Sequence, residues 1–221
     1  MVSDADRAAE AAIVEVLRAE RPDDSLMAEE GAGARGSSGR RWVVDPLDGT
    51  TNFLYGVPQW AVSVALEDGD GTVVGVVHDP VHEETFAAER RRGARLNGDP
   101  IAVREPPPLS EALLATGFSY KAETRAAQAG TLSHLLPRVR DIRRAGAASL
   151  DLAWLAAGRL DGYYERGLSA WDWAAGRLIV AEAGGQVAEL GGEPAGLAAA
   201  APGLMPALVE LLRDAEGAAA S

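Results

Sequence analysis

The chain of 221 residues contains no cysteine and only three histidines. The lack of cysteine excludes disulfides, thiolate nucleophiles and cysteine-based zinc or iron–sulfur sites, and it fits a reducing compartment. His78 and His82 are four residues apart, but Pro80 separates them and the chain has no His-Glu-x-x-His motif. Neither thiol chemistry nor a catalytic zinc site is therefore expected.

Positive charge and long apolar runs are also scarce. The chain has 21 Lys and Arg against 33 Asp and Glu, a net charge of −12, so we expect no nucleic-acid partner. The short arginine runs lack interleaved aromatic residues and are typical of solvated surfaces. No apolar run is long enough to cross a bilayer, and the N-terminus has no signal-peptide pattern. We expect a cytoplasmic protein without membrane contact.

The most informative segment runs from Trp42 to Phe53. In it an apolar strand leads into Asp45 and Asp48, followed by Gly49 and Thr50. A buried carboxylate is costly without a partner, and the natural partner of clustered oxygen ligands is a hard cation such as Mg²⁺. The segment therefore predicts a metal-assisted phosphate site. Taken alone, Asp-Pro and Asp-Gly are also ordinary turn signals.

Three further acidic features lie where elements are predicted to begin or end. Asp6 is in the first turn of a predicted helix, 3–20; Glu29 precedes a Gly/Ser-rich loop expected to be mobile; and Asp172 begins another helix. Each has a purely structural alternative. Asp6 would complement the helix dipole, Glu29 would be a solvated surface acid, and Asp172 would cap its helix together with Ser169. In combination they favour two or more Mg²⁺ ions that bridge phosphate oxygens and acidify a bound water.

The predicted elements differ between the two halves of the chain. The first half is β-rich with short connections, which favours an antiparallel sheet faced by helices. Its expected strands are 25–28, 41–45, 59–67, 72–79, 84–88 and 94–96. The second half alternates strands with helices; we expect strands near 113–116, 139–143, 161–166, 186–190 and 196–200, and helices near 122–137, 146–158, 170–184 and 202–214. The proline-rich stretch 105–110 suggests a division into residues 1–108, which bind metal and phosphate, and residues 109–221, which supply Asp172 and the substrate wall.

Two long motifs resemble signatures of one family. Trp42–Phe53 matches the Asp-Pro-x-Asp-Gly-Thr-x-Asn-Phe signature of the inositol monophosphatase family, whose superfamily includes fructose-1,6-bisphosphatase, and Trp171–Gly176 followed by Glu182–Gly185 resembles the second signature. The similarity covers nearly the whole chain. It implies a sugar-phosphatase sandwich of alternating α-β-α-β-α layers and a homodimer. Because Met1 falls close to a family motif, we expect the family's first N-terminal helical segment to be missing.

The resemblance also implies roles for individual residues. Glu29, Asp45 and the Leu47 carbonyl would hold one Mg²⁺, Asp45, Asp48 and Asp172 a second, and a third, weaker ion would lie near Glu29. The implied catalytic residues are Thr50, Asp6 and Glu29, with Thr50 orienting the attacking water. The implied substrate-binding residues are Leu47, Asp48, Gly49, Thr50, Gly146, Ala147, Ala148, Glu165 and Asp172.

The function that these roles imply is Mg²⁺-dependent, lithium-sensitive hydrolysis of a small polyol phosphate. Inositol 1-phosphate is the expected substrate, because a carboxylate at Glu165 accepts hydrogen bonds from ring hydroxyls; the alternative is a strand-end acid exposed to solvent. Histidinol phosphate, fructose 1,6-bisphosphate and adenosine 3′,5′-bisphosphate are alternative substrates on the same scaffold. A further alternative is a regulatory binding protein with weakened catalysis.

Overall fold

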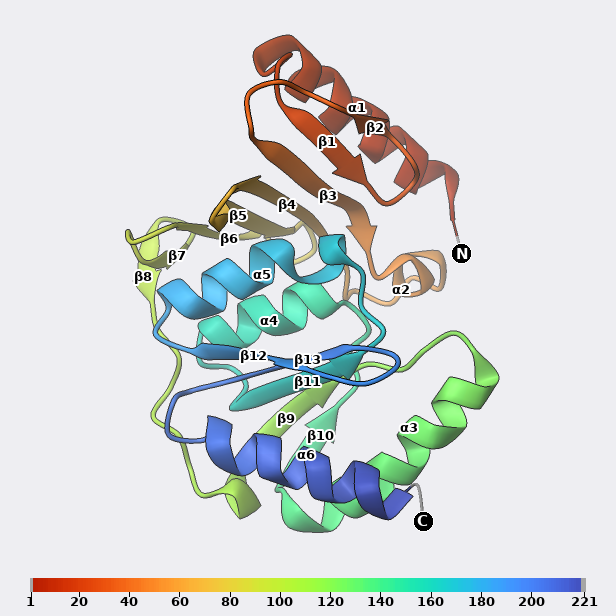
Figure 1. The fold of residues 1–221 in the computed structure, drawn as a ribbon, viewed down its shortest axis with the longest axis vertical. Coiled ribbons are helices and arrows are strands. Elements are labelled where there is room, and N and C mark those ends of the chain that lie inside the picture. The colour runs from red at the N-terminus through yellow and green to blue at the C-terminus, as the bar shows by residue number, and fades with distance from the viewer. Residues whose placement is uncertain (1, 220–221) are drawn as a thin grey trace.

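The layers of the molecule follow from which strand faces are apolar. The computed structural model describes residues 2–219, and Figure 1 shows its layers in the order helix, sheet, helix, sheet, helix. Side chains of the helices between the two sheets are buried against both sheets. This arrangement confirms the expected layered fold with alternating α and β elements.

The first sheet has eight strands in the order β2-β1-β3-β4-β5-β6-β7-β8. Its strands are β1 (Ser25–Ala28), β2 (Gly33–Ala34), β3 (Arg41–Asp48), β4 (Ala61–Asp68), β5 (Gly71–Asp79), β6 (Glu84–Glu89), β7 (Ala94–Leu96) and β8 (Asp99–Ile101). From β3 onward all neighbours are antiparallel, as alternating burial in β4 and β5 predicts. However, β1 pairs with β3 in parallel, a pairing that the expected antiparallel sheet did not include.

The second sheet has five strands in the order β10-β9-β11-β13-β12. Its strands are β9 (Leu113–Thr116), β10 (Asp141–Arg143), β11 (Gly162–Arg166), β12 (Gln186–Leu190) and β13 (Gly196–Ala200). The three strands that alternate with helices, β9, β10 and β11, are parallel, whereas β13 is antiparallel to both of its neighbours. Parallel pairing follows from the helical crossovers, and β12 with β13 forms a hairpin.

Helices cover both sheets and fill the space between them. The helices are α1 (Asp4–Glu20), α2 (Thr50–Leu54), α3 (Ala122–Leu135), α4 (Ala148–Ala156), α5 (Ala170–Glu182) and α6 (Met205–Ala219), with 3-10 turns η1 (Leu109–Glu111) and η2 (Leu136–Arg138). Figure 1 shows α4 and α5 between the sheets, α1 outside the first sheet, and α3 with α6 outside the second. Helix α4 is apolar nearly all round because it is buried on every side. The main core cluster takes Val43 and Phe86 from the first sheet and Leu150 and Ile179 from these helices.

The Gly/Ser-rich loop expected to be mobile is attached to the sheet. It contains β2, and its Gly36 N–H donates to Ser25 Oγ at 2.9 Å. The N–H groups of Ser37 and Ser38 both donate to the carbonyl of Asp23, at 2.9 and 3.0 Å. These bonds hold the connection that lets β1 and β3 run parallel.

Candidate active site

The predicted site residues meet at one edge of the molecule, where β3 and β11 end and where α2, α4 and α5 begin. A pocket of about 290 Å³ opens there; it is lined by Glu29, Asp45, Leu47, Asp48, Gly49, Thr50, Gly117, Phe118, Ser119, Tyr120, Lys121, Arg144, Gly146, Ala148, Glu165, Arg166, Gly167, Leu168 and Asp172. Two of the predicted residues are not among the lining residues. Asp6 lies behind Thr50, and Ala147 is buried with 1% of its surface exposed.

The two acids of β3 are held by backbone geometry. The pairing of β3 with β4 shifts register between Asp45 and Asp48, so the strand is irregular where the carboxylates lie. Asp45 Oδ1 accepts the N–H of Leu47 at 3.0 Å. Asp48 Oδ2 accepts the N–H and the hydroxyl of Ser149 at 2.7 and 2.6 Å, which ties the strand to the first turn of α4. Sequence reasoning missed Ser149, whose only local signal is its place at a predicted helix start.

Asp172 forms the helix cap considered for it in the sequence and also lies in the pocket. Ser169 and Asp172 form a capping box at the start of α5, in which the N–H of Ser169 donates to Asp172 Oδ2 at 2.6 Å. Asp172 also lines the pocket with the two β3 acids. The cap therefore fixes the direction of the carboxylate.

The pocket acids repel one another. Burial, followed by the charges of Asp48, Glu29 and Asp172, raises the pKa of Asp45 well above its usual value. Burial raises the pKa of Asp48 to about 6 although the Ser149 hydrogen bonds oppose this shift. Burial, and then the charge of Asp48, raises the pKa of Asp172 to about 8. A cation relieves this repulsion, since it favours the deprotonated form of each acid.

The donor set fits a hard divalent cation that also binds water and phosphate. Within residues 2–219, no three His, Asp or Glu side chains are already arranged as a metal cage. The hydrogen bonds described above use one oxygen each of Asp45, Asp48 and Asp172. Mg²⁺ is usually held by one or two carboxylates together with waters and substrate phosphates, so it does not need an all-protein cage.

Thr50 connects the pocket to a buried acid. Its hydroxyl lies 2.9 Å from Asp6 Oδ1 and 3.1 Å from the Leu47 carbonyl oxygen. Asp6 is fully buried, and its Oδ2 accepts the N–H of Ser3 at 2.8 Å as well as the Ser3 hydroxyl. Asp6 thus belongs to the capping box of α1 and also orients the threonine.

The rest of the pocket lining contains Glu165 and three cationic side chains, Lys121, Arg144 and Arg166. The Tyr163 hydroxyl donates to Glu165 Oε2 at 2.8 Å, and burial raises the pKa of Glu165 to about 7. Arg144 and Lys121, the only lysine in the chain, line the same pocket. Sequence reasoning gave none of these three cations a role at the site. The uniqueness of the lysine was the signal available for Lys121.

Two glycines shape the floor of the pocket. Gly49 and Gly146 have φ values of 95° and 96°, which side-chain-bearing residues rarely adopt, and a Cβ on Gly146 would lie 2.5 Å from Arg144 Nη1. Between them, Asn52 Nδ2 donates to the carbonyls of Gln59 and Ala145 at 2.7 and 2.8 Å. Asn52 therefore fixes α2 against the loop that precedes α4.

The layered fold and the carboxylate-lined pocket are those expected of a protein of the sugar-phosphatase type. Residues 1–216 match the model of the inositol monophosphatase family, and the chain belongs to that family. It is 46% identical over 189 residues to Nus factor SuhB of Pasteurella multocida, covering 84% of this chain and 70% of the relative. It is 48% identical over 186 residues to an inositol-1-monophosphatase of Rhizobium meliloti, covering 83% and 70%.

Solved structures agree with this assignment. The crystal structure of extragenic suppressor protein suhB from Bartonella henselae superposes with a TM-score of 0.90 at 40% identity, covering 96% of this chain and 84% of that one. Family membership implies a phosphatase that depends on metal. The expectation of no nucleic-acid partner rested on net charge, and the name Nus factor does not accord with it. No helix within residues 2–219 is long and apolar enough to span a membrane.

Proposed function

We propose that the chain is a Mg²⁺-dependent phosphatase of small polyol phosphates, with inositol 1-phosphate as its substrate. The observation that supports this most strongly is that Glu29, Asp45, Asp48 and Asp172 come from separate parts of the chain and line one pocket. A phosphate dianion would be repelled by these acids alone, so the proposal requires cations. Lys121 and Arg144 add positive charge in the same pocket.

The metal-holding residues follow from the same pocket. Glu29, Asp45 and the Leu47 carbonyl would hold one Mg²⁺, Asp45, Asp48 and Asp172 a second, and a third would lie near Glu29. When bound, these ions neutralise the phosphate and lower the pKa of a bound water. The backbone hydrogen bonds to Asp45, Asp48 and Asp172 pre-orient the carboxylates before any ion arrives.

The remaining residues position the substrate and move a proton. Thr50 Oγ1 would accept the proton of the attacking water as its own proton passes to Asp6 Oδ1, its partner at 2.9 Å. The N–H groups of Gly49 and Thr50 would bind phosphate oxygens. Glu165 would accept hydrogen bonds from the hydroxyls of the alcohol, next to the backbone from Gly146 to Ala148.

Phosphate release tests the proposal directly. Inositol 1-phosphate, histidinol phosphate, fructose 1,6-bisphosphate and adenosine 3′,5′-bisphosphate are each assayed with and without Mg²⁺. We expect Mg²⁺-dependent release, fastest from inositol 1-phosphate and inhibited by lithium. Asp48→Asn should abolish it, whereas Asp70→Asn, in an exposed turn, should not. Turnover that survives Asp48→Asn, or that is unchanged without Mg²⁺, would refute the metal assignment.

A second candidate function is regulatory binding on the same scaffold. It is favoured by the name of the Pasteurella multocida relative, Nus factor SuhB. A chain with this function would bind its partner equally well when Asp48→Asn has removed catalysis.

Size-exclusion chromatography with light scattering tests the homodimer that the family resemblance implies.

A further inference from the structure

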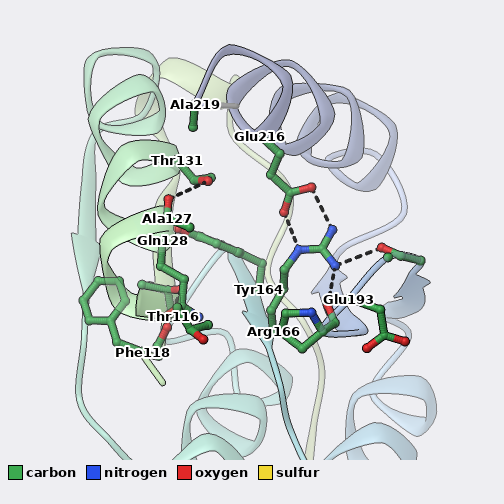
Figure 2. Close-up of a pocket in the computed structure, with 15 residues that line it drawn as sticks. Thr116, Phe118, Ala127, Gln128, Thr131, Tyr164, Arg166, Glu193, Glu216 and Ala219 are labelled. Carbon is green, nitrogen blue, oxygen red and sulfur yellow. Dashed lines mark hydrogen bonds and ion pairs between the residues drawn. The ribbon is translucent and has the colours of Figure 1, made fainter. Parts of the chain in front are cut away.

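A second cavity lies on the other face of the second sheet, away from the layer of α4 and α5. It measures about 360 Å³ and is enclosed by α3, α6, β11 and the hairpin of β12 and β13 (Figure 2). This volume is within the range of small-molecule sites. Its labelled walls are Thr131 and Gln128 on α3, Glu216 on α6, and Tyr164 and Arg166 on β11. The proposed reaction uses none of these side chains.

The one cation in the cavity wall is already paired. Arg166 Nε and Nη2 donate to the two carboxylate oxygens of Glu216 at 2.5 and 2.7 Å. Arg166 Nη1 donates to the carbonyls of Gly191 and Pro194 at 2.9 and 3.0 Å. Glu193 adds a second carboxylate to the wall. An anionic ligand would have to displace Glu216 and approach Glu193, so the charges disfavour it.

The rest of the wall is apolar with a few neutral hydrogen-bonding groups. Phe118, Ala127, Pro194 and Ala219 supply apolar surface. Thr116, Thr131 and Tyr164 also line the cavity, and the Thr131 hydroxyl donates to the Ala127 carbonyl at 3.4 Å. Gln128 Oε1 accepts the N–H of Ser119 at 2.9 Å, so the NH₂ group of that amide is the one left to meet a ligand. Such a mixture suits an uncharged ring that carries one hydroxyl or N–H group.

We infer that this cavity is a second binding site for a small neutral aromatic molecule, separate from the phosphate pocket. We expect a ligand bound in the cavity to shift the position of the Glu165 side chain. Along β11 the side chains alternate, so Tyr164 and Arg166 line the cavity while Tyr163 and Glu165 lie on the opposite face. Gly117, Phe118 and Arg166 line both the cavity and the phosphate pocket.

Gly117 is the closest link between the two sites. A Cβ on it would lie 2.1 Å from the carboxylate atoms of Glu165, so backbone and carboxylate are already in tight contact. A ligand that shifts Gly117 or Tyr164 must therefore shift Glu165. The binding claim stands without the proposed reaction, whereas the coupling claim rests on it.

Binding is measured on the full chain without substrate, by ligand-observed NMR and calorimetry. The probes are phenol and indole, with benzoate as the anionic counterpart. We expect millimolar or tighter binding of the neutral probes and about tenfold weaker binding of benzoate. Ala127→Trp, which fills the cavity mouth from an exposed position, should abolish binding. Ala126→Trp, on the same helix but outside the cavity lining, should leave it unchanged.

A charge-specific variant gives an independent check. Glu216→Gln frees Arg166 from its carboxylate partner, so benzoate should gain about tenfold in affinity while phenol changes little. Absence of phenol and indole binding at millimolar concentration, binding that survives Ala127→Trp, or equal binding of benzoate to the unmodified chain would each overturn the site. The coupling is tested by the KM of inositol 1-phosphate: bound indole should change it in the unmodified chain and not in Ala127→Trp, and an unchanged KM overturns the coupling alone.

Discussion

Single residues at this site have a structural role and a proposed chemical role at once. Asp172 closes the capping box of α5 and points into the phosphate pocket. Asp6 closes the capping box of α1 and accepts a hydrogen bond from the Thr50 hydroxyl. Because a cap needs a hydrogen-bond acceptor and a metal needs a negative charge, substitutions can separate the two roles.

Asp172→Asn should remove the charge and keep the cap. The amide oxygen still accepts the Ser169 N–H, so we expect the thermal midpoint to change by less than roughly 3 °C. The value of kcat/KM should fall by about 10²-fold or more, because a group that stabilises charge in the pocket is lost. Ser169→Ala is the reciprocal control: it should cost about 1 kcal/mol of stability and leave most activity. Full activity in Asp172→Asn would exclude the carboxylate as a ligand.

Gly117→Ala should alter substrate preference through Glu165. The added Cβ would lie 2.1 Å from the Glu165 carboxylate, so that side chain must move. Hydrogen bonds to a charged group contribute about 1.5–3 kcal/mol, so the KM for inositol 1-phosphate should rise about tenfold or more. Glycerol 2-phosphate, which has fewer hydroxyls, should be affected less. Gly69→Ala, where a Cβ meets nothing within 4 Å, is the matched control; equal changes for both substrates would remove Glu165 from the substrate wall.

Asp24 is a buried carboxylate with a purely structural role. Its oxygens accept the Ser38 hydroxyl at 2.6 Å and Trp42 Nε1 at 3.0 Å, and Arg21 Nε lies 3.1 Å away. The Ser38 hydrogen bond is the main cause that lowers the pKa of Asp24. Asp24→Asn should lower the free energy of unfolding by about 1–3 kcal/mol at neutral pH. The reason is that the NH₂ group of the new amide would face groups that are themselves hydrogen-bond donors.

The pH dependence of this loss follows from the direction of the shift. A carboxyl whose folded pKa is lowered stabilises the fold fully above its unfolded value, about 3.9, and loses this contribution as the pH falls through the folded pKa. The difference between the unmodified chain and Asp24→Asn should therefore shrink below about pH 4. Urea unfolding over a pH series measures it, with the exposed neighbour variant Asp23→Asn as control. A difference that does not depend on pH would contradict the assignment.

At the scale of elements, local patterns predicted strands better than they predicted neighbours. The strands β12 and β13 lie where alternation and flanking glycines predict them, at 186–190 and 196–200. The parallel pairing of β1 with β3 was missed, since no local pattern specifies which strand lies beside another across a long connection. That connection also has a steric requirement that composition alone does not reveal.

Gly36→Ala tests this requirement. A Cβ on Gly36 would lie 2.1 Å from the carbonyl oxygen of Asp23, a backbone atom that cannot easily move. Overpacking of this kind costs typically 1–3 kcal/mol, so the urea midpoint should fall. Gly33→Ala is the matched control, because its Cβ would lie 3.8 Å from Leu26 O, an ordinary contact. If the two variants are equally stable, the loop is not packed as described.

At the scale of the whole molecule, the sequence predicted the acids of the site but not their full surroundings. Asp45 and Asp48 belong to one short motif, so their proximity is local. Ser149 and Lys121 come from the second half of the chain and reach the pocket only because α4 begins, and the 117–121 loop lies, at the edge where β3 ends. Their roles depend on the packing of two sheets against one helical layer, which no short segment encodes.

The assembled pocket makes stability depend on pH and on metal in opposite ways. Folding raises the pKa of Asp48 to about 6 and of Asp172 to about 8. A carboxyl with a raised folded pKa stabilises the fold below its unfolded value, near 4, and this contribution is lost as the pH rises through the folded pKa. The metal-free chain should therefore lose thermal stability between about pH 4 and pH 8.

Mg²⁺ should reverse this trend, because it binds the deprotonated acids of the folded chain. At a concentration a hundred times its Kd it contributes about 2.7 kcal/mol, or roughly 5–10 °C in the thermal midpoint. The gain should grow with pH and be smaller in Asp48→Asn, which removes one ligand of the second ion. NaCl at equal ionic strength is the control, since it only screens the charges. A midpoint that rises with pH in the absence of Mg²⁺ would contradict the raised pKa values of Asp48 and Asp172. An equal gain from NaCl would mean that the pocket acids do not bind Mg²⁺ specifically.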